Sequence, residues 1–125
     1  MNFKFFSAMA ILGFTASQSV AANVWSECVK VVGVSDYRPI NSSVIVAMSP
    51  QLPAPCLGGG SGIAGAATLQ VGSGGVTDDN IKGLLAEVLI AKVTDQKVMI
   101  YYDNSSNICS ALIVSLGGYS GQCNQ

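Results

Sequence analysis

Three aromatic side chains are the residues of this chain best suited to contact a ligand. Trp25 is the only tryptophan, and Tyr101 and Tyr102 are consecutive in a β-rich run. Successive residues of a strand point to opposite faces, so one tyrosine should face a core and the other should be partly exposed. Sugars are commonly held by an aromatic face together with a few hydroxyl and amide groups. The pattern therefore fits a sugar site, and an ordinary tyrosine on a sheet surface is the alternative.

Catalytic chemistry has few candidates in this sequence. The chain has no histidine, which removes the commonest general base and every Ser-His-Asp or Cys-His nucleophile system. Asp78 and Asp79 are adjacent, and we interpret them as charges at the start of a helix rather than as a catalytic pair. We therefore expect a protein that is not an enzyme. A histidine-free hydrolase is the alternative, and it needs two carboxylates from Asp78, Asp79, Glu87 and Asp103 to meet in one cleft.

Neither a cofactor site nor a nucleic-acid site is indicated. Residues 60–65 match G-x-G-x-x-G, but a dinucleotide site needs this motif between a strand and a helix, and a β-rich run follows it here. No Walker lysine follows the glycines, so we expect a loop and no cofactor. Six basic and seven acidic residues give a net charge of −1 without a basic stripe, which argues against a nucleic-acid partner.

The first 22 residues have the order of a secretory signal peptide. Lys4 precedes an apolar run over 5–14 and a small-residue stretch over 17–22. The apolar run is shorter than the roughly 20 residues of a membrane span, and a buried N-terminal helix is the alternative. We expect cleavage after Ala22, or one residue earlier, to leave a single domain over 23–125. That domain should be secreted or periplasmic, without a membrane span.

The remaining chain is predicted to be mainly β with one helix. We expect five strands, bounded by turn-forming residues, over 24–34, 43–48, 66–71, 97–102 and 108–116. A loop rich in glycine and proline should fill 49–65. Thr77 is a suitable N-cap for a helix over 77–93. Its apolar residues recur at helical spacing and predict one buried stripe of Ile81, Leu84, Leu85, Val88 and Leu89.

Three strands, a helix and two strands follow one another in the order of a small OB-type barrel. We expect a five-stranded OB-like barrel with the helix between strands three and four, and a plain antiparallel sheet with one packed helix is the alternative. Cys28, Cys56, Cys109 and Cys123 should form two disulfides in an exported chain. They include no C-x-x-C pair, so we expect no metal site.

Four cysteines allow three pairings, and their spacing alone does not choose among them. Strands three and five are neighbours in OB-type barrels. This arrangement would bring Cys109 near the loop that enters strand three. On that ground we favour the pairs Cys56–Cys109 and Cys28–Cys123.

The segment from the helix onward resembles a known family. The helical run LLAEVLIA over 84–91 leads through TDQK into VMIYYD over 98–103. This run is similar to the helix, turn and following strand of pentameric bacterial toxin B subunits, especially the subtilase-cytotoxin branch. The similarity covers about residues 78–116. The cysteine positions and the glycine-rich loop differ from that branch.

The resemblance implies a fold, an assembly and a site. Toxin B subunits of this kind are OB-type barrels that assemble as rings of five, with central helices lining the ring, and they bind cell-surface glycans. The second tyrosine of the Ile-Tyr-Tyr stretch, which lies at the sugar pocket of that branch, matches Tyr102. Ser26 is the nearest match to a serine near the start of strand one that also binds there.

We therefore predict a secreted binding module without enzymatic activity. Its partner would be a cell-surface glycan or a protein, and it would be a homo-oligomer if the resemblance extends to the ring. The alternative is a periplasmic or secreted inhibitor or accessory protein that binds one partner protein. The glycan reading rests on Tyr102, with Ser26 as the nearest match to the second binding residue.

Overall fold

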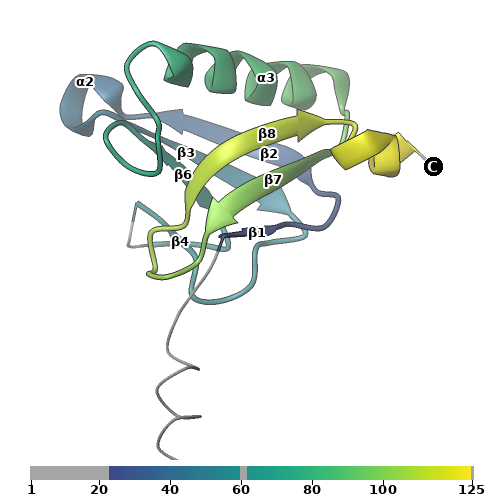
Figure 1. Cartoon of the computed structure of the whole chain (residues 1–125), viewed down its shortest axis with the longest axis horizontal. Coiled ribbons are helices and arrows are strands. Elements are labelled where there is room, and N and C mark those ends of the chain that lie inside the picture. The colour runs from purple at the N-terminus through teal and green to yellow at the C-terminus, as the bar shows by residue number, and fades with distance from the viewer. Residues whose placement is uncertain (1–22, 60–61, 125) are drawn as a thin grey trace, which may run out of the picture.

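The computed structural model describes residues 23–59 and 62–124. The predicted signal peptide over 1–22 lies outside the described residues, and so do Gly60 and Ser61 of the glycine-rich motif. Figure 1 shows one large sheet with the helix α3, Asn80–Thr94, lying across it. No helix in the described part is long and apolar enough to cross a membrane.

Six strands form the main sheet in the order β1-β7-β8-β6-β3-β2. Their bounds are Asn23–Trp25 for β1, Lys30–Asp36 for β2, Ser43–Ser49 for β3, Ala67–Gln70 for β6, Val98–Asp103 for β7 and Ser110–Leu116 for β8. Neighbours are antiparallel except β6 and β8, which pair in parallel at Thr68 and Ser110. The protein is therefore mainly β, as predicted. The described residues form no closed barrel, so the five-stranded barrel is not confirmed.

The strand predicted over 24–34 is divided into β1 and β2. β1 pairs with β7 and β2 pairs with β3, so the two halves lie at opposite edges of the sheet. The segment between them stays bonded to β7. Val29 and Val98 exchange two backbone hydrogen bonds of 2.9 and 2.8 Å. The division arises because the first part of this β-rich run pairs with β7 and the last part pairs with β3.

The connections carry short elements that the sequence analysis missed. A single helical turn, α2 over Arg38–Asn41, joins β2 to β3. The loop predicted over 49–65 contains two strands of two residues each, β4 over Leu57–Gly58 and β5 over Ile63–Ala64, which pair with each other. The backbone amide of Leu52 donates to the Gly65 carbonyl at 2.9 Å. The long loop is thus folded back on itself by backbone hydrogen bonds.

The predicted helix exists but begins three residues later than expected. The residue at the N-cap is Asp79 rather than the predicted Thr77, but Thr77 still bonds the start of the helix, because the Asn80 amide donates to Thr77 Oγ1 at 3.1 Å. The Thr77 amide donates in return to Asn80 Oδ1 at 2.7 Å. This reciprocal pair has the pattern of a capping box, with asparagine in the place of glutamate or glutamine. Asp78 and Asp79 lie in the turn that this pair closes, immediately before Asn80, the first residue of α3.

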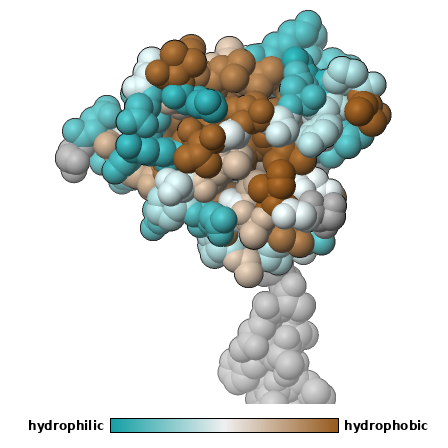
Figure 2. Space-filling model, turned by 180° about the vertical axis from the view of Figure 1, so that it is seen from behind, coloured by the Kyte–Doolittle hydropathy of each residue, from teal (hydrophilic) through white to brown (hydrophobic). Residues whose placement is uncertain are grey.

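The buried stripe of α3 is rotated from its predicted position. Ile81, Val88 and Ala91 are buried against β2 and β8, with Leu84 and Leu85 partly buried beside them. The prediction that Leu89 faces the core is wrong, because 43% of its surface is exposed. The small Ala91 side chain takes the inward position. Figure 2 shows apolar side chains along the top of the reverse face, where Figure 1 places α3.

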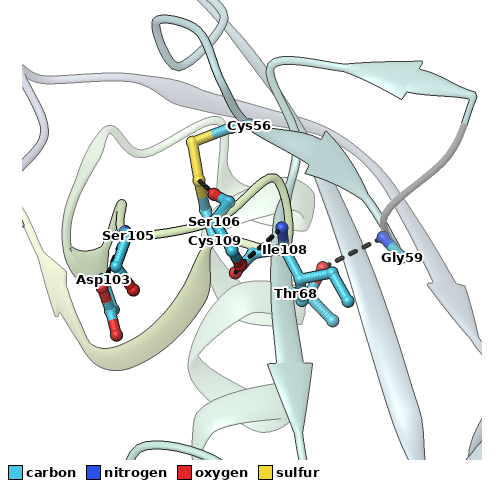
Figure 3. The surroundings of a disulfide bond; sticks show 8 residues. All are labelled: Cys56, Gly59, Thr68, Asp103, Ser105, Ser106, Ile108 and Cys109. Carbon is cyan, nitrogen blue, oxygen red and sulfur yellow. Dashed lines mark hydrogen bonds between the residues drawn. A yellow bond between two sulfur atoms is a disulfide. The ribbon is translucent and has the colours of Figure 1, made fainter. Parts of the chain in front are cut away.

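The structure holds two disulfides, Cys28–Cys123 and Cys56–Cys109, which are the pairs that the strand order favoured. The parallel contact of β6 with β8 brings the second pair together, because the Thr68 amide donates to the Cys109 carbonyl at 2.9 Å. Figure 3 shows Thr68 also accepting a hydrogen bond from the Gly59 amide, at 3.1 Å. The first pair anchors η1 over Tyr119–Asn124, a helical segment that was not predicted.

Candidate functional site

A surface hollow of about 300 Å³ lies beside β1 and brings the two predicted site residues together. Its walls come from the end of β1, the bend after it, the long loop and β7. The lining residues are Trp25, Ser26, Glu27, Val29, Gln51, Leu52, Pro53 and Tyr102. Ser26 and Tyr102 therefore share one hollow, although they are far apart in the sequence. Their part in sugar binding stays a prediction.

Tyr102 forms a wall of this hollow with a ring that is almost fully buried. It lies on β7 opposite Val24 of β1, and only 2% of its surface is exposed. Burial raises the pKa of its hydroxyl. No hydrogen bond in the described part of the chain involves this hydroxyl, yet no fully buried side-chain oxygen there lacks a partner. The hydroxyl oxygen therefore keeps a small accessible area, and Tyr102 is one of the residues that line the hollow.

Ser26 has a structural task that limits what it offers to a ligand. Its Oγ accepts a hydrogen bond of 2.8 Å from the Ile100 amide and donates one of 2.8 Å to the Glu27 carbonyl. A serine hydroxyl has one proton, so only an acceptor lone pair remains. The Ser26 amide also donates to the Ile100 carbonyl at 2.8 Å. Ser26 chiefly fixes the chain after β1 against β7.

Trp25 connects the hollow to a partly exposed group of rings that we name the aromatic cluster: Trp25, Tyr101 and Tyr119. Trp25 and Tyr101 are opposite each other on β1 and β7, with ring centroids 5.1 Å apart. The Tyr119 ring belongs to η1, and its centroid lies 5.6 Å from that of the Trp25 ring. Tilted rings at these separations attract one another. Trp25 is 37% exposed, and its ring lies with Tyr101 on the side of the sheet edge opposite to Tyr102.

Sequence reasoning missed Tyr119, although a signal for it existed. Cys28 follows Trp25 by three residues, and Cys123 follows Tyr119 by four. The disulfide between these cysteines brings the two aromatic residues into the same region. The favoured pairing therefore implied that Trp25 and Tyr119 lie in the same region, but only the structure shows that their rings meet.

The long loop over 49–65 forms one wall of the hollow, which the sequence analysis did not predict. Gln51, Leu52 and Pro53 line the hollow from this loop. Gly65 lies directly against Gln51, with a backbone φ of +70°, and a Cβ there would lie 3.0 Å from the Gln51 Cα. Glycine is needed for so close an approach. Glu27 and Gln51, which carry a carboxylate and an amide, are polar lining residues besides Ser26 and Tyr102.

The four candidate carboxylates of a hydrolase lie at three places in the fold. Asp78 and Asp79 are exposed before α3, and Glu87 lies within α3, where burial raises its pKa. Asp103 ends β7, and the pKa of its carboxyl is lowered by hydrogen bonds from Ser105. Residues 23–59 and 62–124 contain no group of three or more potential ligands that could hold a metal ion. The carboxylate hydrolase gains no support from these positions.

No family model, curated protein or solved structure matches this chain. The likeness to toxin B subunits therefore rests on the residues quoted above. Arguments about function depend on the geometry of the hollow beside β1.

Proposed function

We propose that this chain is an exported binding module without enzymatic activity, and that it recognises a glycan through the hollow beside β1. The observation that carries the proposal is the shared hollow of Trp25 and Tyr102. It offers an aromatic surface and a phenolic hydroxyl with no partner in the described part of the chain. Binding sites of this kind combine apolar walls with a few polar groups that fix orientation.

Each side of the hollow matches one property of a sugar ring. Trp25 lines the hollow from the edge strand β1 with its ring on the Tyr101 side, so its exposed part can pack against a pyranose that reaches over this edge. The Tyr102 hydroxyl, the Gln51 amide and the Glu27 carboxylate can exchange hydrogen bonds with its hydroxyls. Ser26 holds one wall in place and offers one remaining lone pair.

The strand order supports an OB-like fold. If β1 and β2 are counted as one bent strand, the sheet reads first, fourth, fifth, third, second and again first strand. The single parallel pairing lies between the third and fifth strands, β6 and β8. This is the neighbour pattern expected of a five-stranded OB barrel. Two disulfides support export, because they persist in oxidising compartments.

Assembly into a homo-oligomer is a further part of the proposal. The outer side of α3 exposes Leu89, Ile90 and Val93 by 43%, 49% and 84%. Exposed apolar groups gathered on one helix are typical of a surface that another chain covers. Native mass spectrometry of residues 23–125 tests this. A ring of five agrees with the toxin-like reading, and a monomer contradicts it.

A glycan array with purified residues 23–125 tests the proposed function directly. We expect binding to a defined set of glycans and at least tenfold weaker binding for Trp25→Ala, because the packing surface is removed. Tyr102→Phe removes only the hydroxyl and should also weaken binding. Tyr37→Ala is the matched control, since Tyr37 is 39% exposed and does not line the hollow. Absence of binding to every glycan would remove the proposal.

The second candidate is an inhibitor or accessory protein that binds one partner protein. The observation that favours it is the same apolar outer side of α3, which a different protein could cover instead of a second copy. Co-purification discriminates the two. A single stoichiometric partner that is lost with Val93→Asp and retained with Trp25→Ala would favour this function over glycan binding.

A further inference from the structure

The charged groups around the hollow limit which sugars it can accept. Among the described residues that line it, Glu27 is the only one with an acidic or basic side chain. Glu27 is an exposed residue of this lining, so its carboxylate is in contact with solvent beside the hollow. The other lining groups are apolar or uncharged polar side chains. A ligand in this hollow therefore meets one negative charge and no positive charge from the walls.

The basic residues of the described part are placed elsewhere. Lys30, the nearest of them to Glu27 in the sequence, is held by Asp95 with a distance of 3.1 Å between Nζ and Oδ2. Arg38 is held by Asp36, with a shortest distance of 2.6 Å. Lys82 and Lys92 lie on α3, and Lys97 precedes β7. None of these five residues lines the hollow.

Anionic sugars need a partner that this arrangement does not provide. Carboxylate and sulfate groups are recognised by charge-assisted hydrogen bonds from arginine, lysine or clustered backbone amides. Here an anionic group would enter beside the Glu27 carboxylate and lose part of its hydration. Like charges in one site reduce affinity and serve to reject the wrong ligand.

The same groups suit a ligand rich in hydroxyl donors. A carboxylate accepts hydrogen bonds through both oxygens, so Glu27 can hold two neighbouring sugar hydroxyls. The Gln51 amide can donate and accept, and the Tyr102 hydroxyl can do the same. With the Trp25 indole as packing surface, these groups recognise an uncharged ring better than a charged one.

We infer that the hollow beside β1 selects a neutral terminal saccharide and rejects sugars that carry a carboxylate or sulfate. This inference rests on the proposed glycan binding and adds the class of ligand. Glu27 acts as the selective residue, because its carboxylate binds hydroxyls and repels anions. Trp25 and Tyr102 bind the ring without regard to its charge.

A matched pair of oligosaccharides tests the inference. One carries a terminal sialic acid, and the other is the same oligosaccharide after enzymatic removal of that residue, which exposes a neutral sugar. Affinities for residues 23–125 are measured by isothermal titration calorimetry. We expect the neutral form to bind at least tenfold more tightly. Glu27→Gln should weaken the neutral form several-fold and reduce the difference between the two forms, while the control Asp78→Asn should change neither.

The outcomes separate the two proposals. Equal or tighter binding of the sialylated form overturns the inference and leaves glycan binding intact. Preference for the neutral form that is unchanged by Glu27→Gln overturns the role assigned to Glu27. Binding of neither form, together with an empty glycan array, overturns the proposed function and the inference with it.

Discussion

The hydroxyl of Ser26 accepts a hydrogen bond from the backbone amide of Ile100 at a distance of 2.8 Å. A serine side chain here takes the place of a backbone carbonyl, just where β1 ends and the chain bends toward β2. The Ser26 amide returns a bond of 2.8 Å to the Ile100 carbonyl. The wall of the hollow that carries Trp25 and Glu27 is thereby tied to β7.

Ser26→Ala should lower the free energy of unfolding by about 1–3 kcal/mol, because it leaves the Ile100 amide without an acceptor in a buried place. Urea denaturation measures this change. Ser35→Ala on β2 is the control, since the Ser35 side chain makes no hydrogen bond in the described part. Equal, small effects of both substitutions would show that the hydrogen bond contributes nothing.

Tyr102 should make the protein less stable in alkaline solution. Burial raises the pKa of Tyr102 above its ordinary value of 10.0, so the folded state holds the phenolic proton more tightly than the unfolded state. The stability from this group is complete below pH about 10 and is lost as pH rises toward the folded-state pKa. Urea denaturation at pH about 8 and about 11 should show a smaller loss for Tyr102→Phe than for the unsubstituted protein. Identical losses would contradict the burial effect.

Replacing both Cys28 and Cys123 by serine should disturb the aromatic cluster as well as stability. A disulfide that closes a long loop typically contributes about 2–5 kcal/mol. This one closes a separation of 95 residues and anchors the segment that holds Tyr119 against Trp25. The fluorescence of the single tryptophan should therefore change in the folded variant.

The other disulfide supplies the comparison. Replacing Cys56 and Cys109 by alanine should also lower stability, but it leaves Tyr119 anchored beside Trp25. The folded variant should keep the native emission spectrum. The same spectral change in both double variants would contradict a specific link between Cys28–Cys123 and the aromatic cluster.

Gly65→Ala should destabilise the protein more than Gly72→Ala and should weaken ligand binding. Both glycines have a positive φ, of +70° and +88°, so an alanine costs roughly 1–2 kcal/mol at either site. At Gly65 the added methyl group also meets Gln51, whereas at Gly72 nothing lies within 4 Å. Thermal denaturation and glycan titration compare the two. Equal stability and unchanged binding in both variants would refute the tight contact that shapes the loop wall.

Local sequence patterns predicted the elements well where contacts with nearby residues determine the structure. The capping pair of Thr77 and Asn80 and the run that forms β7 follow from nearby residues. The alternation along β7 also placed one tyrosine inward and the other partly outward, as expected. The parallel approach of β6 and β8 agrees with the pairing of Cys56 with Cys109.

The remaining features depend on contacts that the sequence does not encode locally. The bend that separates β1 from β2 is fixed by Val98 and Ile100 on β7, far along the chain. Ala91 rather than Leu89 faces the core, and this depends on how α3 packs across β2 and β8. The wall made by Gln51 depends on backbone bonds inside a loop whose composition predicts only irregular structure.

The most direct test of the account follows the indole of Trp25 by NMR. The chain has one tryptophan, so its nitrogen-proton spectrum contains a single indole signal. Titration with a neutral oligosaccharide selected from the array should shift this signal in a saturable way. The shift should weaken in Tyr102→Phe and persist in Tyr37→Ala. An indole signal that stays fixed while the oligosaccharide binds would contradict the assignment of the hollow beside β1 as the glycan site.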